Sequence, residues 1–535
     1  MSPALDACPG VLTLHPARDG LVARIRLPGG YAGAARWRSL GRLSGAFGDG
    51  CVDLTARGNV QLRGLRAEDA EALAAGAAAT GLMPSAQHDR ARNITASPLS
   101  GLGGRPTLRH LVDALDAALL AGPEFAALPG RFLFALDDGT AGASLASSDL
   151  GLRHAAPALL GPLSAGAASV GVASGGAASV GVASGGAASG GVASDGAASD
   201  GAAVNGAAGG YFDLFVAGRR ADVRVPAAEA VHVVLAATRA ALAAGVGASV
   251  TRIAALADGG QSVAAAVGGT LGAPAPPDTR LPLGPARAAS VASPAHPTPP
   301  AASPARHTDP SDPSRQAPVS QSRSSRGTLH DRDRLTAGSC GESVTIMEEP
   351  GEADVVGARG GAGGSGGVVV VAAPLGRLTG EQVEAIAGLV APDEVVRVGV
   401  AGRLVIPLGA GLGRGEAAAA LPAGDPQTDG GAAARMPAGA GPAAGEGRAE
   451  GVALARLAAA GLIVAADDPM GDVTACSGAA CHRSLADVRG AARPVSEYRK
   501  THWAGCARRC GCPPDAEPVV ALDATRYRMP GEGAA

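Results

Sequence analysis

The C-terminal region of the chain concentrates cysteines. Cys476 and Cys481 bracket a short loop, Cys506 and Cys510 follow, and Cys512 lies two residues further on, so that five of the eight cysteines gather there. Two pairs of thiolates on tight loops can hold the four iron atoms of a 4Fe-4S cluster. They can also hold a tetrahedral zinc ion, or be unrelated buried thiols. In a reducing compartment, clustered cysteines favour metal or redox chemistry over disulfides, and of the three we favour the cluster.

A second group of polar side chains alternates along one predicted hairpin. Successive side chains of a strand point to opposite faces, so polar groups at every second position gather on one face. Arginine is suited to bidentate binding of carboxylates, and the group therefore predicts a carboxylate-binding face; a solvated strand face is the alternative. Its members, with two residues that follow the same unit, are Arg57, Asn59, Gln61, Arg63, Arg92 and Asn93.

The elements that position these residues occur in two units of the order β-α-β-β-α, which indicates an internal duplication. The first unit comprises strand 21–27, helix 34–47, hairpin strands 51–55 and 59–65, and helix 67–80. The second comprises strand 368–373, a helix from Thr379, hairpin strands 394–400 and 403–407, and helix 449–460. Gln382 is placed for a capping box, and Gly461 suits a helix C-terminus.

The duplication continues beyond the helices, but the two copies differ in chemistry. Thr95 aligns with Thr474, and Ser97 aligns with Cys476. The first copy carries the polar row, whereas the second carries the cysteines. We therefore expect the two copies to contribute different parts of one site.

Low-complexity stretches divide the chain. A ten-residue Gly/Ala/Ser repeat at 166–210 cannot bury enough apolar surface to offset its ordering entropy, so we expect a flexible insert. A Pro/Ser/Arg/Gly-rich stretch indicates a disordered linker. The expected segments are 5–80, 81–271 with the insert, linker 272–367, 368–421, flexible loop 422–448 and 449–535.

Composition narrows the function classes. The formal net charge is -3, so no whole-chain basic field favours nucleic acid or an anionic membrane. No apolar run reaches the length of about 20 residues that a membrane span needs, and the first ten residues lack the pattern of a secretory signal. We expect a soluble cytoplasmic protein that binds neither nucleic acid nor membrane.

The hairpin T-A-R-G-N-V-Q, the segment R-N-I-T-A-S-P from Arg92 and the paired cysteines resemble the nitrite/sulfite reductase superfamily. The resemblance implies an α+β fold: duplicated ferredoxin-like half-domains, each followed by a reductase-type α/β domain. It also implies a 4Fe-4S cluster on Cys476, Cys481, Cys506 and Cys510, with Cys510 facing a tetrapyrrole. The first cysteine pair is one residue closer than the family's spacing, which makes Cys512 a substitute ligand to consider.

Within this superfamily, the segments H-P-A-R-D-G-L-V-A-R-I-R-L-P-G-G and L-P-G-R-F-L-F-A-L-D-D-G look most like precorrin-3B synthases. Arg131 and Leu133 stand where sulfite reductases carry two lysines. The resemblance implies a monooxygenase of aerobic cobalamin biosynthesis, in which molecular oxygen hydroxylates precorrin-3A at C20 and a γ-lactone closes to give precorrin-3B. Arg131 would join the polar row in binding the substrate's carboxylates.

Three further expectations accompany this reading. Oxygen activation needs a metal, so a mononuclear non-haem iron near the cluster is expected, with His502 as a nearby candidate ligand. An electron donor, either NADH or a reductase or ferredoxin, would supply the cluster. The alternatives are a sirohaem-dependent nitrite or sulfite reductase, in which the tetrapyrrole is a cofactor, and a non-enzymatic iron–sulfur carrier or zinc-stabilised binding protein.

Overall fold

The computed structural model describes residues 8–140, 142–155, 210–276, 281, 283–285, 365–409, 443–496, 498 and 500–532. All of them belong to one compact unit, formed by Met1–Ala288 together with Ala358–Ala535. Nearly all of the predicted insert at 166–210, and most of the linker at 272–367 and of the loop at 422–448, lie outside the described residues.

The first half-domain builds a five-stranded antiparallel sheet in the order β1-β2-β5-β4-β14. Along β5, Val60 and Leu62 are fully buried in the core, whereas Gln61 and Arg63 lie on the opposite face, as the period of two predicts. Its own elements are β1 (His15–Ala17), β2 (Gly20–Ile25), α1 (Ala34–Phe47), β4 (Cys51–Leu54), β5 (Val60–Leu65) and α2 (Ala70–Ala79).

The second half-domain repeats this plan in a sheet of order β12-β13-β16-β15-β3. The predicted capping box is present at the start of α6, where the Thr379 hydroxyl accepts from the Gln382 N–H and the Gln382 side chain accepts from the Thr379 N–H. Its own elements are β12 (Gly284–Pro285), β13 (Ser365–Ala372), α6 (Gly380–Ala387), β15 (Val396–Val398), β16 (Arg403–Gly409) and α7 (Ala443–Ala459).

Each half-domain lends a short strand to the other. β3 (Tyr31–Ala32), from the first copy, pairs with β15, and β14 (Arg377–Thr379), from the second copy, pairs with β4. A Cβ on Gly58 would lie 3.1 Å from the Gly30 Cα, and a Cβ on Gly402 would lie 3.1 Å from the Gly376 Cα. In each copy, the segment that leads to the exchanged strand therefore packs backbone against backbone on that copy's own hairpin turn. The two copies thus share the same local geometry.

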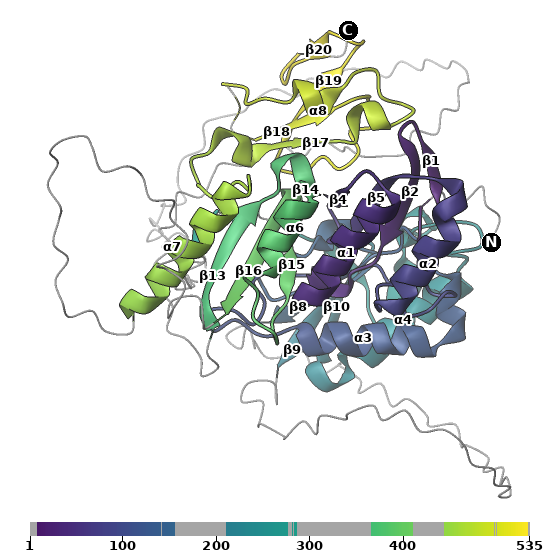
Figure 1. The fold of residues 1–535 in the computed structure, drawn as a ribbon. Coiled ribbons are helices and arrows are strands. Elements are labelled where there is room, and N and C mark those ends of the chain that lie inside the picture. The colour runs from purple at the N-terminus through teal and green to yellow at the C-terminus, as the bar shows by residue number, and fades with distance from the viewer. Residues whose placement is uncertain are drawn as a thin grey trace, which may run out of the picture. The chain divides into compact units, whose positions relative to one another are not determined.

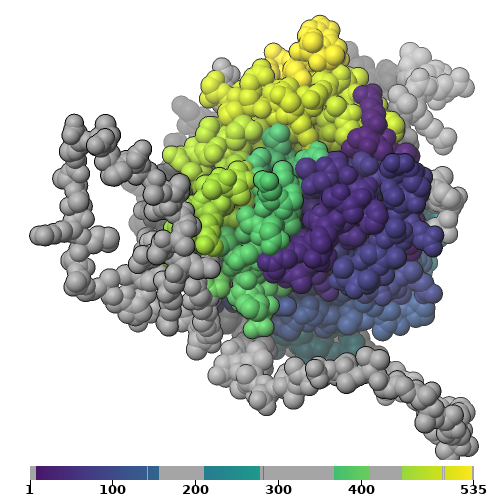
Figure 2. Space-filling view, viewed as in Figure 1, coloured from purple at the N-terminus to yellow at the C-terminus, as the bar shows by residue number. Residues whose placement is uncertain are grey.

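Both half-domain sheets share one hydrophobic core. Helices α1 and α6 pack against each other over it (Figure 1), and in the space-filling view their purple and green surfaces meet side by side (Figure 2). The close packing leaves no spare room at Gly41 of α1, where a Cβ would lie 3.2 Å from the Val383 side chain of α6. The core thus fixes the two copies against each other.

Each half-domain is followed by an α/β sheet. The first is six-stranded, in the order β11-β10-β9-β8-β7-β6, and the second is four-stranded, in the order β17-β18-β19-β20. In both, the first three strands of the sequence run parallel. The fold is therefore the expected α+β fold of duplicated half-domains with two α/β domains.

The first sheet contains β6 (Ile94–Ala96), β7 (Phe134–Asp137), β8 (Leu150–Ala155), β9 (Tyr211–Val216), β10 (Arg219–Pro226) and β11 (Leu271–Pro274), with helices α3 (Arg109–Ala121), α4 (Ala230–Ala243) and α5 (Gln261–Ala265). The second contains β17 (Val473–Ala475), β18 (Thr501–Ala504), β19 (Glu517–Ala521) and β20 (Tyr527–Arg528), with helix α8 (Val488–Ala491).

In the part of the chain that the structure describes, no helix combines the length and the apolar character that crossing a membrane requires.

Candidate functional site

Four of the C-terminal cysteines line one small cavity of about 40 Å³. Cys476 follows β17 and Cys481 ends a short turn behind it, while Cys506 and Cys510 follow the neighbouring strand β18. Because β17 and β18 are parallel, the loops after them emerge at the same edge of the sheet. We call this cavity the cysteine pocket; its lining residues are Cys476, Ser477, Cys481, Ser484, Gly505, Cys506 and Cys510.

Backbone donors already point at one of these sulfurs. The Gly505 N–H donates to Cys476 Sγ at 3.2 Å, and the Gly478 N–H donates to it at 3.5 Å. Any Cβ on Gly505 would lie 1.8 Å from the Ser484 hydroxyl, so the close approach needs glycine. Such N–H···S bonds stabilise thiolate and tune the potential of a bound cluster.

The other three cysteines of the pocket affect the pKa of Cys510. Burial raises the pKa of Cys510, and the neighbouring Cys506, Cys476 and Cys481 raise it further, while Arg508 opposes them. Without a metal the pocket therefore disfavours the Cys510 thiolate, whereas a coordinating metal ion deprotonates thiols. Four thiols are a donor set that can hold an iron–sulfur cluster or a tetrahedral zinc ion.

Cys512, the substitute ligand, does not line the cysteine pocket. Its Sγ lies 3.5 Å from the Pro513 carbonyl oxygen and 3.7 Å from that of Ala516. His502 is buried in β18, with its Nδ1 2.9 Å from the Thr474 hydroxyl. Within the described ranges, no group of three or more His, Cys, Asp or Glu side chains is arranged to hold a single metal ion.

Part of the predicted polar row holds a loop rather than facing open space. Arg57 donates to the carbonyl oxygen of Arg131 (3.2 Å), and Asn93 donates to that of Phe132 (3.1 Å). The Asn59 amide donates to Asn93 Oδ1 (2.7 Å), which completes the chain of contacts. The loop in turn presents the Arg131 side chain, which is exposed.

The remaining members of the row are engaged elsewhere. Arg92 makes a buried bidentate pair with Asp116, with both N–O distances 2.7 Å. Gln61 lies beside Arg24, whose Nη2 is 2.6 Å from the side-chain oxygen of Gln61 once the amide is turned towards it. Arg63 makes a bidentate pair with Asp19, with N–O distances of 2.9 and 3.0 Å. The row thus has three parts. Arg57, Asn59 and Asn93 hold the loop of Arg131. Arg63 and Arg92 form ion pairs, and Gln61 contacts Arg24.

Sequence reasoning missed two cations, Arg24 and Arg26, which alternate on β2 and its extension while Ala23 and Ile25 enter the core. Arg26 is 3% exposed and its Nη2 donates to the Gly130 carbonyl oxygen at 3.1 Å. Its Nε and Nη1 are buried and have no hydrogen-bond partner. The signal was present in the sequence, because Arg-Ile-Arg has the same period of two as the hairpin.

These cations crowd one another. Burial and Arg24 lower the pKa of Arg26 to about 9, with Cys8 and Asp89 opposing the shift. Burial and the cations Arg252 and Arg24 likewise lower the pKa of Arg57 to about 10. Both guanidinium groups remain charged at neutral pH, so the lowered pKa values express the cost of burying like charges together. An anionic ligand would offset that cost.

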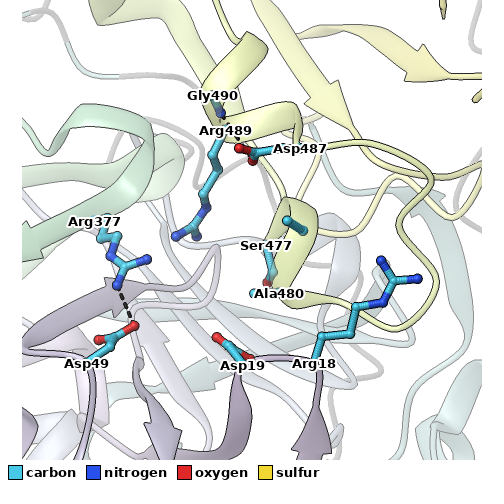
Figure 3. Close-up of a pocket in the computed structure, with 10 residues that line it drawn as sticks. Arg18, Asp19, Asp49, Arg377, Ser477, Ala480, Asp487, Arg489 and Gly490 are labelled. Carbon is cyan, nitrogen blue, oxygen red and sulfur yellow. Dashed lines mark hydrogen bonds and ion pairs between the residues drawn. The ribbon is translucent and has the colours of Figure 1, made fainter. Parts of the chain in front are cut away.

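The segment 476–481, which we call the cysteine loop, also lines a larger opening of about 410 Å³, through Ser477, Ala479 and Ala480 (Figure 3). Arg489 reaches into it from α8, Arg18 and Asp19 face it from the β1–β2 turn, and Arg377 pairs with Asp49 across it. We call it the charged pocket.

Comparison with known proteins gives a family for part of the chain. Residues 15–80 match the family model described as "Nitrite/Sulfite reductase ferredoxin-like half domain". Ferredoxin–nitrite reductase of Synechococcus elongatus is 35% identical over 134 residues, which are 23% of this chain and 26% of that protein. The Leptolyngbya laminosa enzyme of the same name is 30% identical over 135 residues, 24% of this chain and 26% of that protein. The chloroplastic enzyme of Arabidopsis thaliana is 31% identical over 117 residues, 20% of each chain.

The match therefore spans about a quarter or less of the length of these relatives. Among solved structures, the Mycobacterium tuberculosis NirA protein superposes with a TM-score of 0.51 over 92% of this chain and 69% of that one. The two sequences are 15% identical, so this likeness concerns the fold.

The comparisons correct the functional prediction. The relatives reported above are named nitrite reductases, so the predicted precorrin-3B synthase-like monooxygenase, with precorrin-3A and molecular oxygen as substrates, is wrong. The error has a physical reason: a row of cations that binds tetrapyrrole carboxylates is the same whether the tetrapyrrole is substrate or cofactor. The predicted oxidoreductase alternative, a nitrite or sulfite reductase, agrees better with these relatives. Residues 15–80 thus match the nitrite/sulfite reductase ferredoxin-like half-domain family, and part of the chain is similar to nitrite reductases.

Proposed function

We propose that this chain is a reductase of nitrite, with sulfite as the second candidate substrate, and that it uses a 4Fe-4S cluster and sirohaem. The observation that carries the proposal is the convergence of four thiols on the cysteine pocket, together with a face of arginines on the first half-domain. One hairpin joins the two: Arg57 contacts the loop of Arg131, and Arg63 contacts the cysteine loop at Ala480.

The cysteine pocket fits an iron–sulfur cluster. Its four ligand candidates are Cys476, Cys481, Cys506 and Cys510, and the N–H donors of Gly478 and Gly505 suit a sulfur that carries negative charge. Cys510 is the most exposed of the four, which suits the ligand that faces a neighbouring tetrapyrrole. The cluster would relay single electrons, and a ferredoxin-type donor is supported by the names of the relatives.

The arginine face fits the carboxylates of sirohaem. Arg26 presents two buried nitrogen atoms without a protein partner, and an unpaired buried cation is costly unless an anion pairs with it. Arg24 and Arg57 add positive charge beside it. These residues would hold carboxylate groups and orient the macrocycle.

Sirohaem would supply the metal at which a small oxyanion is reduced. The protein's part is to bind and orient that anion, and Arg131 is the candidate because its loop is fixed by Arg26, Arg57 and Asn93 while its side chain is exposed. Leu133, two residues on, is fully buried and adds no charge. A single cation suits the monoanion nitrite better than the more highly charged sulfite, as the names of the relatives also favour.

The test is expression with a sirohaem supply, followed by an absorption spectrum, assays of iron and acid-labile sulfide, and turnover with a reduced ferredoxin or viologen. We expect sirohaem bands, a cluster that bleaches on reduction, and nitrite consumption that exceeds sulfite consumption. A folded protein that holds a cluster but no sirohaem would refute the reductase and favour the alternative function of an iron–sulfur electron carrier. A folded protein without iron would refute both.

A further inference from the structure

Asp53 is a buried carboxylate surrounded by three guanidinium groups. It lies on β4 with 4% of its surface exposed. Arg489 binds it through two nitrogens, with Nη1 3.3 Å from Oδ1 and Nη2 3.2 Å from Oδ2. The Nε atoms of Arg377 and Arg63 lie 3.6 and 3.9 Å from its oxygens. The three arginines come from α8, β14 and β5, so one carboxylate joins the α/β domain of β17–β20 to both half-domains.

Two of these arginines also hold the cysteine loop. Arg489 Nε donates to the carbonyl oxygen of Cys476 at 3.1 Å, and Arg63 Nη2 donates to that of Ala480 at 3.2 Å. These carbonyls belong to the first ligand candidate and to the residue directly before the second, Cys481. Both ends of the short loop are therefore fixed by guanidiniums that share Asp53.

The β1–β2 turn adds a third attachment on the wall of the charged pocket. The Arg18 backbone N–H donates to the Ala480 carbonyl oxygen at 3.1 Å, and its Nη2 donates to that of His482 at 3.2 Å. Figure 3 shows Arg489 and Arg18 on opposite sides of Ser477 and Ala480. The cysteine loop is thus held from outside by side chains of the first copy and of α8.

We propose that Asp53 is a positioning residue for the cluster: it orients Arg489 on the cysteine loop and balances the charge of Arg489 and of the neighbouring Arg63, and so sets the reduction potential. Arg63 itself is oriented by Asp19. The inference rests on the proposed cluster. Asp53 does not touch the thiols; it acts through the two guanidiniums that bind the loop's carbonyls. A buried carboxylate among three cations contributes through charge that solvent screens little.

The sign of the effect follows from charge. Reduction adds an electron to the cluster, so added positive charge nearby favours the reduced state and raises the potential. Asp53→Asn removes one negative charge with little change of shape, and we expect it to favour reduction by roughly tenfold, which is about 59 mV for a one-electron couple. Arg489→Gln removes one positive charge and should lower the potential.

The experiment is a redox titration of the cluster, by electron paramagnetic resonance, in the anaerobically purified full-length protein. Asp213→Asn is the matched control, because Asp213 also pairs with two arginines, Arg220 at 3.0 Å and Arg224 at 3.4 Å, but on the sheet of β9 and β10. We expect its potential to equal that of the wild type. Asp53→Glu keeps the charge and should shift the potential less than Asp53→Asn.

The outcomes separate this inference from the proposed function. If the wild type holds no cluster, the proposed function fails and this inference fails with it. If the wild type holds a cluster but Asp53→Asn and Arg489→Gln both match Asp213→Asn, the proposed function stands and the inference is overturned. Should Asp53→Asn not fold, Arg489→Gln decides alone, since Arg489 is partly exposed and its loss must lower the potential.

Discussion

Ser97 and Cys476 make the same backbone hydrogen bond in the two copies of the fold. The Ser97 N–H donates to the Leu136 carbonyl oxygen and the Cys476 N–H donates to that of Trp503, each at 3.0 Å. The preceding threonines are equivalent too: the hydroxyls of Thr95 and Thr474 each lie 3.2 Å from a carbonyl oxygen on the neighbouring strand. One position thus carries a hydroxyl in the first copy and a thiol in the second, so two copies that share a backbone differ in the chemistry of this side chain.

The first prediction concerns the ligand set. Changing Cys476, Cys506 or Cys510 to Ser should abolish or strongly reduce iron and acid-labile sulfide, because each lines the cysteine pocket. Cys512→Ser is the control and should retain wild-type iron, since its sulfur faces the Pro513 and Ala516 carbonyls. Iron and sulfide assays on anaerobically purified protein check this. Equal iron in Cys510→Ser and Cys512→Ser would contradict the assignment.

The second prediction concerns pH. The pKa of Cys510 is raised, so in protein stripped of metal its thiolate fraction is smaller than that of an ordinary thiol at the same pH. Alkylation of Cys510, followed by mass spectrometry, should be slow at about pH 7 and accelerate above about pH 8.5, the ordinary cysteine pKa. The stability of the apo-protein should fall as pH rises above that value, because a raised folded-state pKa stabilises the fold only while the thiol is protonated. Bound cluster should protect Cys510 at every pH.

The sequence predicts local structure well where patterns are local. The helix at 34–47 has the predicted bounds, and the capping box at Thr379 is confirmed. The exchanged strands β3 and β14 were not predicted, because two or three residues carry no periodicity and their partners are more than 300 residues away. The duplication was visible in the order of elements, whereas the exchange between copies is a tertiary property.

The candidate site was predicted in part for the same reason. The four cysteines that line one pocket are those that spacing had grouped. Arg92 shows the limit: an arginine after a polar hairpin looks like a ligand-binding residue, but its partner Asp116 lies on α3 and no local pattern announces the pair. Arg26 is the opposite case, a candidate residue that sequence reasoning did not find. It is a candidate for anion binding because it is buried, and its burial depends on the whole fold.

The third prediction follows from the Arg92–Asp116 pair. Arg92→Gln should destabilise the protein by about 3 kcal/mol or more, because it leaves a carboxylate without its cation in a largely buried place. Arg38→Gln breaks an ion pair with Glu384 whose side chains are 39% and 63% exposed, and should cost about 1 kcal/mol or less. Urea denaturation measures both. Similar costs for the two variants would show that the buried pair contributes no more than the surface pair.

The fourth prediction separates cofactor binding from stability. Arg26→Met should leave the apo-protein as stable as the wild type or more so, because it removes a buried cation with two unpaired nitrogens. The same change should lower sirohaem content, measured as absorbance per protein. Arg131→Gln, on an exposed side chain, should retain sirohaem and raise the KM for nitrite. Unchanged sirohaem in Arg26→Met would remove Arg26 from the cofactor site.

The fifth prediction concerns the hairpin turn that each exchanged strand passes as it leaves its own copy. Gly58 and Gly402 have φ of 69° and 72°, and a Cβ on either would press on the backbone of Gly30 or Gly376 at 3.1 Å. Gly58→Ala and Gly402→Ala should each destabilise the protein by about 1–2 kcal/mol or more, the cost of a left-handed backbone for alanine before any steric clash. Gly45 lies in α1 with open space around its Cβ position, so Gly45→Ala should stabilise by up to about 1 kcal/mol. Chemical denaturation of the three variants tests these close approaches. If both are as tight as 3.1 Å, the two turn variants lose similar stability. A tolerated Gly402→Ala beside a destabilising Gly58→Ala would mean that the turn of the second copy lies farther from Gly376 than the structure shows.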